Sequence, residues 1–284
     1  MNFHFMKLIR KLGNAYRLFN KNRPVFVGRF RAEIKRNICR PPQSQNLKLG
    51  DVVFPFDLAL GPHMEKMYFG DYGLEIAVLL KKFLKPGMTF LDVGANVGYF
   101  SALALNLVGT TGLVVSFEPV PTFADRLKTM VALNPRYRIL CNDYGLGERE
   151  DTVEISICGN DNIGWNTMVP DFMAAAEISK TASVRIRRLD HYLSEERINQ
   201  VDLIKIDVEG YEFPVLQGAK NFLEKTKPII ISEIAPAAYS KLHTSLMELQ
   251  IYMNQFGYRT YDSTLRPMSL TALSSTSDVV FIAS

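Results

Sequence analysis

The sequence has little of the residues that build disulfide frameworks and zinc sites. Among 284 residues there are three cysteines, Cys39, Cys141 and Cys158, and no two of them are close in the chain. An odd count without short spacings argues against a disulfide framework, and a reducing compartment is expected. The four histidines are scattered, with no pair at i, i+4, so no zinc site is predicted.

Long apolar runs are also missing. None approaches the ~20 residues that a membrane-spanning helix needs, so no segment is expected to cross a bilayer. The composition is otherwise that of a folded protein, with 47% hydrophobic, 22% charged and 11% aromatic residues. These values exclude a disordered, collagenous or coiled-coil chain. The length suits one large domain or a domain with an appended segment.

Acidic residues are nearly absent from the first fifty positions. Residues 1–50 hold twelve lysines and arginines and one acid, Glu33, which gives a charge of +11. Residues 51–284 hold 21 basic and 28 acidic side chains, which gives −7. A basic arm therefore precedes a mildly acidic body, and this asymmetry indicates an anionic partner for the arm.

The start of this arm is predicted to form an amphipathic helix over residues 3–20. Its apolar residues at helical spacing are Phe5, Ile9, Leu12, Tyr16 and Phe19. A basic amphipathic helix is typical of an anionic membrane surface, and equally of a helix docked on a domain edge with its charges in water. An arginine-rich, acid-poor start is also a feature of mitochondrial presequences. We expect a cytoplasmic protein with peripheral membrane association through residues 3–20. The prolines of residues 21–50 predict an irregular stretch or short pieces there.

From Lys85 onward, strand and helix patterns alternate. Short apolar runs predict buried strands at 88–93, 113–117, 137–141, 201–206 and 228–232. Periodic patterns predict helices at 98–108, 121–133, 211–223 and 240–256, and further strands are expected at 151–157, 184–188, 258–261 and 278–283. This order predicts an α/β fold, doubly wound, with a mostly parallel sheet and helices on both faces. The predicted organisation is a basic arm at 1–50, a cap or substrate-side segment at 51–85, and a catalytic domain at 86–284.

Polar residues follow the predicted buried strands, where an open parallel sheet binds its ligand. The first loop reads DVGANVG over residues 92–98, with Asn96 where a dinucleotide fingerprint has its second glycine. A side chain there argues against a pyrophosphate. Glu118 lies 24 residues after Gly94, at the end of the next strand, and an acid there can accept both hydroxyls of a ribose. A ribose without a pyrophosphate indicates S-adenosylmethionine.

A lysine and three acids follow on the later strands. Lys205 and Asp207 are two residues apart on one strand, so they share a face and are predicted to pair. Asp207 is the first candidate for the base that a hydroxyl acceptor needs, and Glu209 and Glu233 are the next. Structural roles are the alternative for Asp207 and Glu233. Converging carboxylates also suit a divalent cation, but without histidine or fixed ligand spacing no metal is predicted.

The segment before the predicted domain offers acceptor-side residues. His63, in Gly-Pro-His-Met, lies where the chain should cover the cofactor, and the aromatic segment 68–72 is expected near the acceptor. A lone histidine in a loop is also typical of a surface or packed residue.

Residues from Lys85 to about Ile234 resemble the FkbM family of S-adenosylmethionine-dependent methyltransferases. The segments that carry the resemblance are PGMTFLDVGANVGYFSALAL, VVSFEPVPTFADRLKTMVALNP, NDYGLG, VDLIKIDVEGYEFPVLQGAKNFL and KPIIISEI. The resemblance implies a class I, Rossmann-like methyltransferase fold with a seven-stranded sheet whose last strand is antiparallel. It also implies S-adenosyl-L-methionine as the cofactor.

The resemblance further implies which residues contact this cofactor. They are Asp92, Gly94, Asn96, Gly98, Tyr99, Glu118, Asn142 and Asp143. The glycine loop would border the methionine part, with Asp92 beneath it and Tyr99 capping the site. Glu118 would hold the ribose, and the last two residues would lie near the adenine. At these last two the chain reads NDYGLG and departs from the small-residue pattern common in the family.

The leading hypothesis is a methyltransferase that acts on a hydroxyl of a sugar, glycan, lipid-linked or secondary-metabolite acceptor. The alternatives are an N-methyltransferase on the same fold, a nicotinamide-dependent oxidoreductase on a related sheet, and a non-catalytic nucleotide-binding module. Asn96 argues against the oxidoreductase, and the intact motifs at 92–98 and 207–210 argue against a module that has lost activity. A nucleic-acid partner is not expected, because no recognition module is present and the body is acidic.

Overall fold

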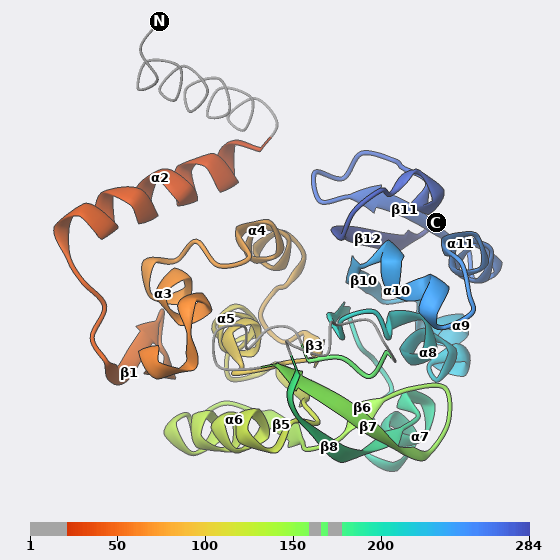
Figure 1. Cartoon of the computed structure of the whole chain (residues 1–284), viewed down its shortest axis with the longest axis horizontal. Helices are drawn as coiled ribbons and strands as arrows, with labels where there is room; N and C mark the ends of the chain where they lie inside the picture. The colour runs from red at the N-terminus through yellow and green to blue at the C-terminus, as the bar shows by residue number, and fades with distance from the viewer. Residues whose placement is uncertain (1–21, 159–165, 170–177) are drawn as a thin grey trace, which may run out of the picture.

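The computed structural model describes residues 22–158, 166–169 and 178–284 (Figure 1). The amphipathic helix predicted over residues 3–20 lies outside these ranges. In the described part of the chain, no helix combines the length and the apolar character needed to cross a membrane.

A seven-stranded sheet forms the centre of the molecule, in the order β11-β12-β10-β9-β3-β4-β5. Strand β12 is antiparallel to both of its neighbours, and the remaining pairs are parallel. The predicted α/β fold is therefore confirmed, together with its antiparallel last strand. The strands are β3 (Thr89–Val93), β4 (Leu113–Phe117), β5 (Ile139–Asn142), β9 (Leu203–Ile206), β10 (Ile229–Ile234), β11 (Tyr258–Asp262) and β12 (Ser277–Ala283).

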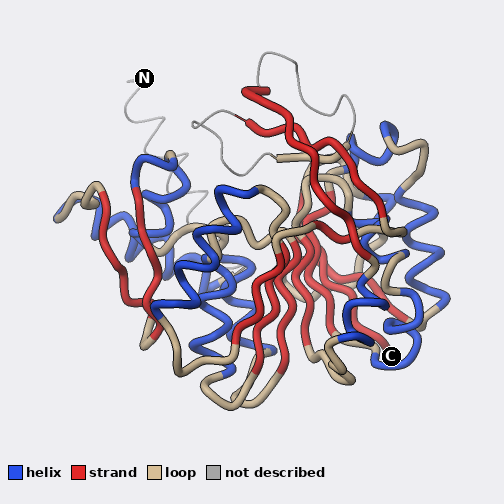
Figure 2. Tube along the Cα trace, turned by 90° about the horizontal axis from the view of Figure 1, so that it is seen from below, coloured by secondary structure: helices blue, strands red, loops and turns tan. Residues whose placement is uncertain are grey.

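Helices cover both faces of this sheet (Figure 2). Because alternate side chains of a strand point to opposite faces, Phe90 of β3 packs in one hydrophobic core and Leu91 in the other. The first core lies under α4 (Leu74–Phe83), α5 (Tyr99–Val108) and α6 (Pro121–Leu133). The second lies under α7 (Leu189–Glu195), α8 (Glu212–Gln217), α9 (Lys220–Thr226) and α11 (Leu246–Gln255), and α10 (Pro236–Lys241) follows β10.

The helix predicted over 211–223 is two helices, α8 and α9, separated by a turn at Gly218. A Cβ on Gly218 would lie 2.0 Å from the carbonyl oxygen of Gly147, so the close approach of another loop explains the break. A second sheet contains β6 (Gly145–Leu146), β8 (Ile178–Arg187) and β7 (Asp151–Cys158), in that order.

The stretch 21–50 was expected to be irregular or made of short pieces, and a long helix in its first half departs from this expectation. It contains the helix α2 (Arg23–Ile38) and the strand β1 (Ser44–Leu49). The side chain of Asn22 caps α2 by accepting a hydrogen bond from the amide of Val25. Pro24 lies in the first turn, where its missing N–H has no intrahelical partner to lose, so here proline favours a helix start.

Strand β1 forms a hairpin with β2 (Val52–Asp57), and the predicted boundary at residue 50 falls at its turn. The buried side chains of β2 join the core under α5 and α6. The amide group of Asn134, after α6, pairs with the backbone of Val53: it donates to the carbonyl at 2.7 Å and accepts from the N–H at 2.8 Å. The side chain of Asn134 thus makes the two hydrogen bonds that a neighbouring strand would make, and it holds β2 on the domain. The helix α3 (Pro62–Phe69) follows the hairpin.

We expect Asn134→Ala to destabilise the protein by about 2 kcal/mol, because it removes three hydrogen bonds, two to the backbone of Val53 and one to the carbonyl of Met130, and leaves the groups of Val53 unpaired. Urea denaturation of the variant and the parent measures this difference. The matched control is Asn254→Ala on the exposed side of α11, which should stay within about 0.5 kcal/mol. An Asn134→Ala variant as stable as its control would contradict this role.

Candidate active site

The loop after β3 passes very close to the loop after β9. Gly94 has φ +77°, and a Cβ there would lie 1.9 Å from the carbonyl oxygen of Asp207, so only glycine allows this approach. The amides of Gly94 and Ala95 both donate to the carbonyl of Phe117 at 3.0 Å, which ties the loop to the end of β4. The carboxyl ends of β3, β4 and β9 therefore meet at one place, at the point where the strand order reverses.

A buried network lies directly beneath this loop. The ammonium of Lys205 is 3.1 Å from Asp207 Oδ2 and 3.6 Å from Asp92 Oδ1, which confirms the predicted pairing with Asp207. Lys205 is 2% exposed and Asp92 is fully buried. Ser101 Oγ donates to Asp92 Oδ2 at 2.5 Å, and the ammonium lies 5.0 Å from the ring centroid of Phe100.

The charges of this network depend on one another. Burial disfavours the ammonium of Lys205, but Asp207 and Asp92 outweigh burial and raise the pKa of the lysine above its ordinary value. Burial raises the pKa of Asp92, and Lys205 opposes that shift. Each buried charge is thus paired, as a stable fold requires.

Glu118 directly follows β4, and its carboxyl group binds the glycine loop. Its Oε2 accepts from the amide of Asn96 at 2.8 Å and its Oε1 accepts from the amide of Val120 at 2.9 Å. Burial raises its pKa to about 7, against the effect of these two hydrogen bonds. Glu118, Gly94 and Asn96 line a narrow pocket that β6 and β7 cover through Leu146 and Ile155.

Three carboxylates converge beside the glycine loop, and two of them, Asp207 and Glu209, also line the narrow pocket. Oxygen atoms of Asp207, Glu209 and Glu233 all lie within 4.8 Å of one another. Asp278 of β12 is paired with Glu233 in the sheet and adds a fourth carboxyl. Burial and the neighbouring carboxylates raise the pKa of Glu209, and Asp207 followed by burial raises that of Glu233. Burial and Asp207 raise the pKa of Asp278 to about 7.

The loop that carries Glu209 is itself tightly held. Glu209 has φ +50°, a strained value for a residue with a side chain. Its carbonyl accepts from Thr167 Oγ1 at 2.7 Å, and the fully buried Glu212 accepts from the amide of Gly210 at 2.9 Å. Sequence reasoning missed Glu212, Thr167 and Asp278. Of these three, only Asp278 could have been found from the sequence, because it is an acid at the edge of an apolar run.

These carboxylates face a cavity of about 560 Å³. Tyr72 and Tyr99 meet edge to face in its lining, with ring centroids 5.6 Å apart, and His63 lies 5.5 Å from Tyr72. Burial lowers the pKa of His63, so its imidazole is neutral at pH 7. Its buried Nδ1 has no hydrogen-bond partner within the described residues. Of the segment 68–72, Asp71 and Tyr72 line this cavity together with His63, whereas Tyr68, Phe69 and Gly70 do not.

The residues predicted at the cofactor do not all lie in the same place. Glu118 lines the narrow pocket, Tyr99 lines the larger cavity, and Gly94 and Asn96 line both. Asp92 is beneath the loop. Gly98 lines neither space: a Cβ there would lie 2.6 Å from Leu127 Cδ2, so this glycine lets α5 pack closely on α6.

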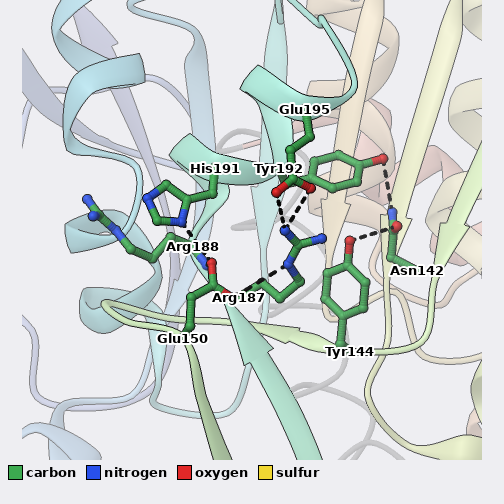
Figure 3. Close-up of polar contacts among 8 residues, drawn as sticks. All are labelled: Asn142, Tyr144, Glu150, Arg187, Arg188, His191, Tyr192 and Glu195. Atoms are coloured by element: carbon green, nitrogen blue, oxygen red, sulfur yellow. Dashed lines mark hydrogen bonds and ion pairs between the residues drawn. The ribbon is translucent and has the colours of Figure 1, made fainter.

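Asn142 and Asp143 line neither of these two spaces. Asn142 donates to Tyr192 and accepts from Tyr144, beside the ion pairs of Arg187 and Glu195 (Figure 3). Asp143 pairs with Lys128 and Arg185, each at 3.2 Å. These contacts occupy both side chains, and the structure does not bring them to the site.

The residues at the glycine loop fit S-adenosylmethionine. Glu118 borders the narrow pocket with a carboxylate whose remaining lone pairs can accept ribose hydroxyls. Because Gly94 has no side chain, backbone and ligand atoms can approach it closely. The surplus of carboxylates beside it favours a cation such as a sulfonium.

Comparisons with known proteins agree with this geometry. The model of the family described as "Methyltransferase FkbM domain" matches residues 92–260. "2-O-methyltransferase NoeI" of Sinorhizobium fredii is 28% identical over 153 residues, which are 50% of this chain and 62% of that protein. "Hexuronic acid methyltransferase AglP" of Haloferax volcanii is 26% identical, over 49% of this chain and 53% of that protein. The chain thus spans between half and two thirds of these two relatives.

A solved structure is also similar. Methyltransferase FkbM from Methylobacillus flagellatus KT has a TM-score of 0.46 and 15% sequence identity, and the match covers 77% of this chain and 54% of that one.

We expect Glu118→Gln to weaken the binding of S-adenosylmethionine at least tenfold, on the order of one charge-assisted hydrogen bond. Because the pKa of Glu118 is raised to about 7, binding by the parent should strengthen as the pH rises through 7, and the variant should lose the part of this dependence that Glu118 supplies, while the part from the carboxylate cluster remains. Titration calorimetry between pH 6 and pH 8, about one unit on each side of that pKa, measures both effects. The exposed Glu224→Gln on α9 is the control; equal affinities for Glu118→Gln and parent would overturn the assignment.

Asp278→Asn should make stability less dependent on pH. The raised pKa of Asp278 means that the folded protein keeps a proton that the unfolded chain releases, so stability is full below the ordinary value of 3.8 and is lost as the pH rises to about 7. At pH 8 the ligand-free variant should exceed the parent by on the order of 2 kcal/mol, and at pH 4 the difference should vanish. Denaturation curves at the two pH values test this, with the 75% exposed Asp125→Asn as control. A pH-independent effect would argue for a purely steric role.

Proposed function

Because the chain belongs to the methyltransferase FkbM domain family, we propose that it transfers a methyl group to a hydroxyl of a sugar or glycan acceptor. The cofactor of this domain is S-adenosyl-L-methionine. Lipid-linked sugars and hydroxylated secondary metabolites belong to the same chemical class of acceptor. The observation that carries the proposal is the cluster of Asp207, Glu209 and Glu233 at the wall of the 560 Å³ cavity, next to the glycine loop.

The larger cavity suits a polyhydroxylated acceptor. Its rings, Tyr72 and Tyr99, offer flat apolar surfaces, and its carboxylates accept hydrogen bonds from hydroxyl groups. The names of two relatives point the same way, since one is a 2-O-methyltransferase and the other acts on hexuronic acid. The same acidity would also hold an ammonium group, which keeps N-methylation as the second candidate.

When bound, S-adenosyl-L-methionine would supply a methyl group on a cationic sulphur: an acceptor oxygen would form a bond to the methyl carbon as the carbon–sulphur bond breaks, and the neutral thioether would leave with the bonding electrons. A neutral hydroxyl is a poor nucleophile and gains from a base within hydrogen-bond reach. The cluster offers such bases in two environments. Asp207 is held at 3.1 Å by Lys205, which fixes its orientation and engages one of its oxygens.

Glu209 and Glu233 are less engaged, and their raised pKa values bring them closer to the working pH. A base accepts a proton most effectively when its pKa is near the pH at which the enzyme works. We therefore place the acceptor proton on Glu233 or Glu209, and give Asp207 the task of orienting the acceptor hydroxyl. The sequence analysis ranked Asp207 first even though it predicted the pairing with Lys205, and this proposal reverses that order.

Glu233→Gln is expected to lower kcat about 100-fold or more, and to leave the affinity for S-adenosylmethionine within a few-fold. Glu233 acts as a base only when it is ionised, and its pKa is raised. We therefore expect kcat of the parent to rise with pH above neutrality, and the variant to lose this rise.

The assay uses cofactor labelled in the methyl group, a panel of sugars and amino sugars, and mass spectrometry with NMR to locate the methyl on oxygen or nitrogen. Glu224→Gln serves as the exposed control. Unchanged turnover in Glu233→Gln would remove this residue from the reaction. Label found only on nitrogen would replace the O-methyl proposal by the second candidate.

A further inference from the structure

Helix α2 carries an apolar stripe on its outer side. Val27, Phe30, Ile34 and Ile38 are 39%, 58%, 45% and 79% exposed. Their spacings of three, four and four residues place them on one face of the helix. No other part of the described chain buries these side chains, and α2 lies at the edge of the molecule (Figure 1).

The opposite face of α2 is fixed to the protein. Val25 and Ala32 are fully buried, and Gly28 packs against Leu74 of α4, where a Cβ would lie 2.8 Å from that side chain. Two ion pairs hold the same side: Arg29 with Glu75 at 2.9 Å, and Arg36 with Asp71 at 2.8 Å. The orientation of the helix is therefore set, and the stripe faces away from the body.

Basic side chains accompany the stripe. Arg31 lies on the flank of the stripe, is exposed, and makes no ion pair within the described residues. Lys35 is on the same flank, with its ammonium at the carbonyl of Tyr68, and the exposed Arg40 follows the helix. Glu33 is the one acid among residues 1–50, which carry +11 in total.

We propose that α2 is a docking surface for an anionic lipid bilayer. The apolar stripe would enter the boundary between headgroups and acyl chains, while the flanking cations would meet lipid phosphates. Long basic side chains are suited to this, because their stems stay apolar while their charges reach the headgroups.

A second copy of the chain suits the stripe less well. Four side chains on one helix fall short of the roughly 800 Å² that each partner buries in a stable dimer. A symmetric contact through α2 would also bring two arms of +11 together. A bilayer has neither difficulty, since binding scales with inserted apolar area and with attraction to anionic lipid.

Docking in this way would bring the cavity close to the lipid surface. Arg29 lines the 560 Å³ cavity from the inner side of α2, so the cavity and the stripe are about one helix diameter, ~10 Å, apart. A lipid-linked acceptor could then reach the carboxylates. This consequence rests on the proposed function, whereas the docking itself does not and is tested without any methyl transfer.

The test is sedimentation of the full chain with vesicles of phosphatidylcholine alone, or of phosphatidylcholine and phosphatidylglycerol in equal parts. We expect binding to the anionic vesicles only, and weaker binding as salt increases. Phe30→Ser with Ile34→Ser should weaken this partition about tenfold, through the lost apolar contact. The matched control is Met247→Ser with Ile251→Ser on α11, a pair with 53% and 51% exposure four residues apart, which should bind like the parent.

A spectroscopic measurement separates the bilayer from other occupants. Trp165 is the sole tryptophan, so Trp165→Phe combined with Phe30→Trp places one fluorophore on the stripe. Its emission should be that of a solvated indole in the free protein and should shift to the blue with anionic vesicles. Blue emission that vesicles leave unchanged would show that residues 1–21 or a second copy cover the stripe, and would overturn the proposal. A parent that stays in the supernatant, or a double-serine variant that binds as well as the parent, would do the same.

Discussion

The ammonium of Lys205, shared between Asp92 and Asp207, is the interaction on which the site depends. A lysine that is 2% exposed is tolerated only with partners, and the two carboxylates come from the ends of adjacent strands. By binding both, Lys205 fixes the loops after β3 and β9 against each other, at the contact where Gly94 admits no side chain. The architecture of the sheet and the geometry of the site are thus linked through one buried charge.

The network leaves an excess of negative charge in the cavity. Lys205 compensates for Asp92 and Asp207 in part, while burial and the nearby acids raise the pKa values of Glu209 and Asp278, and Asp207 and burial raise that of Glu233. In the ligand-free protein this repulsion is relieved by holding protons. A bound sulfonium would relieve it by its own charge, and the same carboxylates would then accept the proton of the acceptor. Binding, stability and proton transfer are in this account three consequences of one electrostatic arrangement.

Much of the fold followed from local pattern, and so did the centre of the site. The alternation of apolar strands and helices after Lys85 predicted the sheet, and the spacing of Lys205 and Asp207 predicted their pairing. The rest depended on contacts between distant segments. The position of Asp278 beside Glu233 depends on the pairing of β12 with β10, and the contacts of Asn142 with Tyr144 and Tyr192 follow from no local pattern. Pro24 suggested an irregular segment. It lies in the first turn of a helix because Asn22 caps that helix, and a single asparagine is a weak sequence signal for a helix start.

The most direct test of the electrostatic claim compares S-adenosylmethionine with S-adenosylhomocysteine, whose sulphur is uncharged. Calorimetry would give the ratio of the two affinities between about pH 6 and pH 9, across the raised pKa values of the cluster. The account predicts that the ratio shifts towards the charged ligand as the pH rises and the carboxylates ionise. A ratio that does not change over this range would contradict it, because the cluster would then not face the sulfonium.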